Sequence, residues 1–378
     1  MNLSIKKKLT ALLLLPLLFV LFLVFAELKT LYINYFQASK ISKLVYIIKN
    51  TSNLVHETQI ERGMSSGFLG SNGTLYRDEL KSQRKKSDEA FLIFKSSLDS
   101  LVLENYSADL KASSEKVINI FNNLSSVRSM VDSFALTAPE TVGFYDKMND
   151  ETLKLIEPIS FLAPNNEIFN SIKAYLLFLF SKERTGIERA TLNNAFSSNK
   201  FNPGMFLIFS SLMTEQELFM KEFVFYSSKE NVDYVNNKLE GNAIVEVNRM
   251  RKIAIDNYDI GNFNINPKYW FSTITEKINI MKEIEDYLLL DLIQKVESHK
   301  KNSIQVFIIE SVIFLIVTIL TLTLGLIVVS GITKSVQEVS DESHYLSSGD
   351  LTVVLDTSNN DELGKMNEKL NIFIFNLK

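Results

Sequence analysis

The stretch LTALLLLPLLFVLFLVFAEL, at residues 9–28, is apolar and is interrupted only by Thr10, Pro16 and Glu27. Its length matches the roughly 20 residues that an α-helix needs to cross the hydrocarbon core of a bilayer. A second apolar stretch, IQVFIIESVIFLIVTILTLTLGLIVV at residues 304–329, is longer and contains a single charged residue. We therefore predict two membrane-spanning helices, one near the start of the chain and one near its end.

The charge beside the first apolar stretch predicts its orientation. Residues 6–8 are all lysine, and a basic cluster beside a span stays in the cytoplasm. The alternative is a cleaved signal peptide, because Val24-Phe25-Ala26 resembles a cleavage site, but the apolar run exceeds the usual length of about 7 to 15 residues. The predicted domains are a cytoplasmic basic N-terminus at 1–8, transmembrane helices at 9–28 and 304–329, a periplasmic domain at 29–303 and a cytoplasmic domain at 330–378.

Composition restricts the fold class and the function. The 378 residues are 46% hydrophobic and include only 6 Pro and 13 Gly, which is typical of long helices, so we predict an all-α fold. The formal net charge of -4 provides no basic surface for nucleic acid. The absence of Cys excludes disulfides and thiolate metal sites.

Helical patterns separated by turn signals fill the region between the two spans. Four are expected in its first half, up to about residue 66 and at 75–105, 108–136 and 140–157, and four in its second half, at 167–196, 203–226, 231–257 and from 267 onward. Amphipathic helices of this length with short connections bury their apolar faces best as antiparallel bundles. We predict a pair of up-down four-helix bundles flanked by the two transmembrane helices.

Two arginine-containing blocks repeat within this region. They read QIERG at residues 59–63 and ERTGIERA at residues 183–190, and each lies late in the opening helix of its half. Three of the 8 Arg fall in these blocks, in a chain that otherwise uses 32 Lys. The planar guanidinium offers a fixed fork of donors, whereas Lys is a point charge. This geometry suits a small planar oxyanion such as nitrate, nitrite, acetate or bicarbonate.

The same arginines have a second interpretation. Arg62, Arg184 and Arg189 could form ion pairs on a helix surface or between helices. Arg184 and Glu188, for example, have the i, i+4 spacing of such a pair. The spacing of the blocks is compatible with both interpretations.

The blocks resemble the nitrate- and nitrite-sensing family, the NIT domain, which is found outside the membrane in bacterial chemoreceptors and other sensors. The matching residues are VHETQIERGMSSGFL at 55–69, ERTGIERA at 183–190, and Trp270 with Thr273 and Ile274. The resemblance covers roughly residues 45–290. It implies two up-down four-helix bundles that bind an anion through arginines between helices. The ligand-binding residues implied for this chain are Arg62, Arg184, Arg189 and Arg251.

The residues after the second span resemble a HAMP linker. The resemblance lies in GITKSV at 331–336, SGDL at 348–351 and DELG at 361–364, although Ser335 stands where this family usually has Pro, which puts the junction kink in doubt. Two apolar seams are predicted, at Ile332, Val336, Val339, Ser343 and Leu346 and at Leu363, Met366, Leu370, Phe373 and Leu377. Such seams predict a parallel four-helix coiled coil in a homodimer.

Residue types used in metal binding and catalysis are sparse. His56 and Glu57 begin like a zinc metalloprotease motif, but Ile60 occupies the position of the required second His. The chain has 3 His in scattered positions and no set of nucleophile, base and orienting group. We predict no metal site, no cofactor and no enzymatic activity.

Together these features predict a homodimeric, two-pass receptor of the methyl-accepting chemotaxis protein type in the bacterial inner membrane. It would bind nitrate, nitrite or a similar small anion outside the membrane and relay a packing change through HAMP. We expect no output module in this chain, and we expect the signal to pass to full-length chemoreceptors or to a separate output module. The alternative is a truncated structural or dampening subunit that dimerises with full-length receptors without binding a ligand.

Overall fold

The computed structural model describes residues 4–358 and 360–377, and among these residues there is no β-strand. The elements are α1 (Ile5–Gly70), α2 (Arg77–Asp99), the short 3-10 helix η1 (Leu103–Asn105), α3 (Ala108–Asn122), α4 (Leu124–Asp132), α5 (Ala138–Lys154), α6 (Ile156–Ser160), α7 (Asn166–Ser198), α8 (Met205–Tyr226), α9 (Lys229–Lys238), α10 (Asn242–Asp256), α11 (Pro267–Ser347) and α12 (Glu362–Leu377). The predicted all-α fold is confirmed.

The chain divides into two compact units. The sensor unit comprises Phe36–Asn302, and the membrane unit comprises Met1–Tyr35 together with Ser303–Lys378. Because of their length, α1 and α11 contribute residues to both units.

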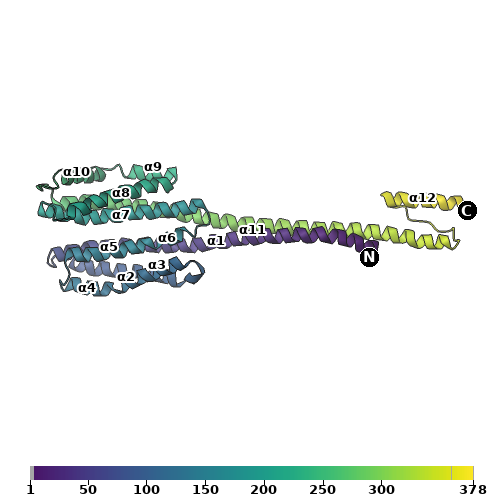
Figure 1. The fold of residues 1–378 in the computed structure, drawn as a ribbon, viewed down its shortest axis with the longest axis horizontal. Helices are drawn as coiled ribbons and strands as arrows, with labels where there is room; N and C mark the ends of the chain where they lie inside the picture. Colours follow the sequence, from purple (N-terminus) through teal and green to yellow (C-terminus); the bar gives the residue numbers. More distant parts are fainter. Residues whose placement is uncertain (1–3, 359, 378) are drawn as a thin grey trace. The chain divides into compact units, whose positions relative to one another are not determined.

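The helices of the sensor unit form two groups (Figure 1). The first group contains the sensor part of α1 with α2 to α6, and the second contains α7 to α10 with the sensor part of α11. One core of buried side chains is shared by both groups, and it includes Ile48 and Phe94 from the first and Phe178 and Ile284 from the second. A smaller core in the second group surrounds Trp270. Apolar burial therefore holds the two groups together as one unit.

Side-chain caps explain where several of these helices begin. Ser107 and Asn165 each accept a backbone hydrogen bond at the first turn of α3 and α7. At the start of α5, Thr137 and Glu140 form a capping box, in which each side chain accepts a hydrogen bond from the backbone N–H of the other. These bonds satisfy amide groups that a helix cannot pair internally.

Three helices that the sequence pattern predicts as continuous are interrupted. The breaks lie at Asn123 between α3 and α4, at Leu155 between α5 and α6, and before Asn242 between α9 and α10. The second break has a clear cause, because Pro158 has no N–H to donate to the carbonyl four residues earlier and its ring clashes with that carbonyl. At the third break Gly241 caps α10 in an extended conformation.

The membrane unit contains two apolar stretches, one in α1 and one in α11, with mean hydropathy of 2.9 and 3.0. Their large side chains are exposed in the isolated unit, as shown by Leu12 at 74% and Leu326 at 66%. Leu13 packs against Gly325, where a Cβ atom would lie 2.5 Å from the leucine Cδ1. Two long apolar helices with such a surface are consistent with a membrane protein.

Within the same unit, the connector before α12 packs on that helix. The Asn371 side chain accepts a hydrogen bond from the Leu355 N–H at 2.8 Å and donates one to the Leu355 carbonyl at 2.9 Å. Leu355 and Ile374 are buried, whereas Phe373 and Leu377 of the predicted seam are more than half exposed. The seam of α12 is therefore left open in the single chain, and the HAMP coiled coil remains a prediction.

Candidate functional site

The two arginine-containing blocks meet where α1 passes α7. The Nη2 atom of Arg62 lies 2.7 Å from the position that a Cβ atom would occupy on Gly186. Reciprocally, Nη2 of Arg189 lies 3.3 Å from the corresponding position on Gly63. Each guanidinium thus rests against the bare backbone of a glycine in the opposite block, and a side chain at Gly186 would occupy the space of Arg62.

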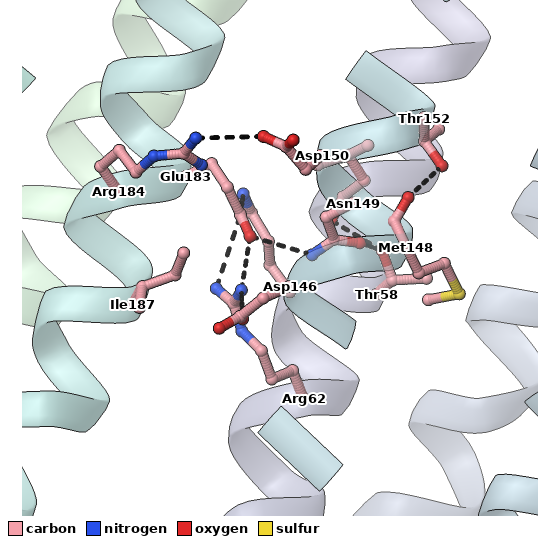
Figure 2. Close-up of polar contacts among 12 residues, drawn as sticks. Thr58, Arg62, Asp146, Met148, Asn149, Asp150, Thr152, Glu183, Arg184 and Ile187 are labelled. Atoms are coloured by element: carbon pink, nitrogen blue, oxygen red, sulfur yellow. Dashed lines mark hydrogen bonds and ion pairs between the residues drawn. The ribbon is translucent and has the colours of Figure 1, made fainter. Parts of the chain in front are cut away.

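Arg62 is held by two carboxylates. Its Nη1 atom donates to Asp146 on α5 at 2.5 Å and to Glu183 on α7 at 2.5 Å (Figure 2). The arginine is 2% exposed and Glu183 is fully buried. Burial works against the charge of Arg62, but Glu183 and Asp146 outweigh it and raise the pKa of Arg62 above its ordinary value.

Glu183 has further donors besides Arg62. Gln59 on α1 donates to its carboxylate, and Asn149 on α5 donates to it at 3.4 Å. The Asn149 side chain in turn accepts a hydrogen bond from the Thr58 hydroxyl at 2.6 Å. Three donors from α1 and α5 meet at this one carboxylate, so Glu183 anchors α1 and α5 to α7.

Asp146 is supported less well. Arg62 provides its only hydrogen bond or ion pair among the described residues. Burial raises the pKa of Asp146 to about 6, against the opposing effect of Arg62, and the nearby charge of Glu183 adds to the rise. The Asp146 carboxyl group is therefore about half protonated in a mildly acidic solution, near pH 6.

Arg189 differs from Arg62 because no carboxylate in the described part of the chain forms an ion pair with it. Its Nη1 donates to the Thr275 hydroxyl at 3.1 Å, and its guanidinium lies 4.9 Å from the centroid of the Phe271 ring. The indole N–H of Trp270 fixes the backbone here by donating to the Arg189 carbonyl at 3.1 Å. Burial and the charge of Arg62 lower the pKa of Arg189 to about 10, so it stays protonated at neutral pH.

The glutamate before each arginine is bound in the same way in both helix groups. Glu61 accepts two hydrogen bonds from Arg128 on α4, at 2.7 and 2.8 Å, and Glu188 accepts two from Arg251 on α10, at 2.6 and 2.5 Å. Both glutamates are fully buried. The internal repeat seen in the sequence is therefore also a repeat of tertiary contacts, in which the Glu faces its own helix group and the Arg faces the other block.

The structure separates the four arginines that the family resemblance implies as ligands. Arg62 and Arg189 come together, and Arg251 binds the glutamate adjacent to Arg189. Arg184 points to Asp150, at 3.1 Å (Figure 2), and also pairs with Glu215. The guanidinium of Arg184 also lies over the rings of Phe180 and Phe219.

The i, i+4 ion pair between Arg184 and Glu188 is therefore not the one that forms, because each side chain reaches partners on other helices. Sequence analysis also missed Asp146 and Arg128 as members of the network. The only signal that could have pointed to Arg128 is its place in the third helix of the first half, which matches the place of Arg251 in the second half.

Comparison with known proteins identifies the family of this chain. Residues 53–293 match the family model described as nitrate and nitrite sensing, so the chain belongs to the NIT family. The predicted resemblance to this family is confirmed.

Two individual proteins are similar to this chain. It is 21% identical over 247 residues to the nitrate regulatory protein of Klebsiella oxytoca, an alignment that covers 65% of this chain and 62% of that protein. It is also similar in fold to the solved structure of the NasR transcription antiterminator, with a TM-score of 0.67, 19% identity and 93% of each chain covered.

Proposed function

We propose that this chain is a membrane-anchored sensor subunit that binds nitrate, nitrite or a similar small planar anion between Arg62 and Arg189. The observation that carries this proposal is the convergence of two guanidinium groups on α1 and α7, one of which has no carboxylate partner in the described residues. Membership of the nitrate- and nitrite-sensing family supports the choice of ligand.

The charge at Arg189 favours an incoming anion. A partly buried cation without a counter-ion is costly, which is why burial and Arg62 depress its pKa. An anion that accepts hydrogen bonds from both arginines would offset this cost. A planar oxyanion presents its oxygens side by side, which matches the fork of a guanidinium better than a spherical ion does.

For the chain as a whole we propose a two-pass protein of the bacterial inner membrane, with the sensor unit in the periplasm and both ends in the cytoplasm. The sensor unit is proposed to be a pair of up-down four-helix bundles, one for each helix group, and the residues after α11 to form a HAMP coiled coil in a homodimer. The open seam of α12, with Phe373 at 57% exposure, supports such pairing. The protein is proposed to be a receptor of the chemotaxis type without enzymatic activity.

The proposed signal starts with the packing of α1 against α7. An anion that binds both arginines interacts differently with alternative packings of these helices and shifts their populations. Since α1 and α11 each contribute residues to both units, a small helix shift in the sensor unit is proposed to bias the packing of the membrane unit.

Calorimetric titration of the full chain in detergent with nitrate, nitrite, acetate and chloride tests the proposal. Nitrate or nitrite should bind, and Arg62→Lys and Arg189→Lys should each weaken binding by ~1.5 kcal/mol or more, which is about tenfold. Arg249→Lys is the matched control, because Arg249 is exposed and, among the described residues, its ion pair is an ordinary surface pair with its helix neighbour Glu246.

If neither Arg62→Lys nor Arg189→Lys changes the affinity, the ligand binds at a site other than the one between these two arginines. Absence of binding for all four anions would leave the alternative of a dampening subunit that dimerises with full-length receptors.

A further inference from the structure

The Nη1–Nη2 edge of the Arg62 guanidinium is already occupied by carboxylates. Its Nη1 atom already serves both Asp146 and Glu183 at 2.5 Å, and the remaining contact from Nη2 to Glu183 is long, at 3.5 Å. An oxyanion that takes paired hydrogen bonds from this Nη1–Nη2 edge therefore competes with one of these carboxylates. Which carboxylate leaves Arg62 depends on the interactions that each one keeps without it.

The two carboxylates differ in what they keep when Arg62 is withdrawn. Glu183 retains its hydrogen bonds from Gln59 and Asn149. Asp146 retains no hydrogen bond or ion pair among the residues that the structure describes. Its side chain is 24% exposed, so solvent reaches it, whereas Glu183 is fully buried. Asp146 is thus the weaker competitor for Arg62.

We propose that the anion displaces Asp146 from Arg62 and that Asp146 takes up one proton from solvent as it does so, which makes anion binding proton-coupled. This inference rests on the proposed function. It assigns Asp146 as a residue that controls access to the site. One proton enters with each monovalent anion, so the net charge of the buried cluster does not change on binding.

The charges that face Asp146 favour this coupling. The positive charge of Arg62 on α1 lowers the pKa of Asp146, and the negative charge of Glu183 on α7 raises it. Arg184, also on α7, adds a smaller attraction, but that arginine is engaged by Asp150 and Glu215.

The other helices that pack against α5 carry charges that are engaged elsewhere. Lys116 of α3 pairs with Glu151, and Glu157 of α6 pairs with Lys173. Burial already places the pKa of Asp146 at about 6 while Arg62 is bound to it. When an anion takes over Arg62, the main interaction that lowers this pKa is lost and a further negative charge is added, so the pKa rises.

Two other groups near the arginines titrate at higher pH. The pKa of Arg189 is lowered to about 10, so it stays protonated from pH 6 to 8 and takes up no proton there. Burial and the charge of Arg251 lower the pKa of Lys277 to about 8, so Lys277 does titrate within this range. An experiment must therefore separate the proton of Asp146 from that of Lys277.

Calorimetric titration of the full chain with nitrate and with nitrite, in buffers of different ionisation enthalpy at pH 6, 7 and 8, counts the protons taken up. The affinity should rise up to about tenfold per pH unit as pH falls from 8 to 6, because one proton is linked to binding. Below pH 6 the affinity should level off, since Asp146 is then protonated before the anion arrives.

Asp146→Asn should bind the anion at pH 8 at least as tightly as the unmodified chain does at pH 6, without proton uptake. Asp150→Asn, one turn further along α5 and paired with Arg184 rather than Arg62, should retain the uptake. Binding without proton uptake, or uptake that persists in Asp146→Asn, would overturn this inference alone. Absence of binding by either anion at every pH would overturn the proposed function as well.

Discussion

Arg62 lies directly against Gly186, with its Nη2 atom 2.7 Å from the position of a Cβ atom on that glycine. The two residues come from different helix groups and are brought together only where α1 passes α7. Their contact defines how closely the two blocks approach. Arg62 can occupy its position only because residue 186 is a glycine without a side chain.

We expect Gly186→Ala to weaken nitrate binding about tenfold or more, the loss associated with ~1.5 kcal/mol for a charge-assisted hydrogen bond. The added methyl group would push the Arg62 guanidinium out of place. Gly143→Ala is the matched control, because Gly143 also lies within a helix, but no atom beyond its chain neighbours and its own helix backbone lies within 4 Å of its Cβ position. Calorimetry on both variants checks the prediction, and equal affinities would show that the contact is not needed.

The pair formed by Arg251 and Glu188 leads to a prediction about stability. Glu188 is fully buried, so Arg251→Gln leaves an unpaired buried carboxylate and should lower the free energy of unfolding by about 3 kcal/mol. Arg249→Gln, which removes an exposed arginine, should cost less than about 1 kcal/mol. Chemical denaturation of both variants measures the difference.

A second experiment on this pair separates a structural role of Arg251 from ligand binding. The double variant Arg251→Gln with Glu188→Gln removes both charges and should recover most of the lost stability while it still binds nitrate. Recovered stability without nitrate binding would instead identify Arg251 as a ligand.

His56 should contribute a pH dependence to stability. Burial and the charge of Lys182 lower the pKa of His56 from 6.5 to about 4. The unfolded chain therefore binds a proton here more readily than the folded protein, and stability is lost as pH falls from about 6.5 to 4. His56→Gln cannot be protonated, so its stability relative to the unmodified protein should increase over this range. Denaturation curves at pH 7, 5.5 and 4.5 test this, and a constant difference would contradict it.

The open seam of α12 allows a test of the proposed homodimer. The chain has no Cys, so a cysteine introduced at Phe373 reports only on its own surroundings. We expect it to crosslink two copies in membranes and expect Leu370→Lys to abolish the crosslink, because a charge within an apolar seam opposes pairing. Glu368→Lys, at an exposed position outside the seam, should leave the crosslink intact. Crosslinking that survives Leu370→Lys would argue against the coiled coil.

Local patterns in the sequence determined the helical fold, the two apolar stretches and the family. Composition and the 3.6-residue period act over one helix at a time, so they can be recognised without knowledge of neighbouring helices. The blocks around Arg62 and Arg189 also marked the place where α1 and α7 meet, because they are short, distinctive and repeated. Interruptions such as the one at Leu155 were not predicted, since an apolar stripe continues through a break of a single residue.

Only the tertiary structure decided which arginines meet and what they meet. Arg62 bonds to Asp146, 84 residues away, and to Glu183, 121 residues away, and nothing in the local pattern of either acidic residue distinguishes it from a solvent-exposed one. Arg184 and Arg189 belong to one block, yet one turns toward Asp150 and the other toward Thr275. These outcomes depend on how α1, α5 and α7 pack, because side-chain partners between helices are set by their relative rotation and register rather than by spacing along one helix.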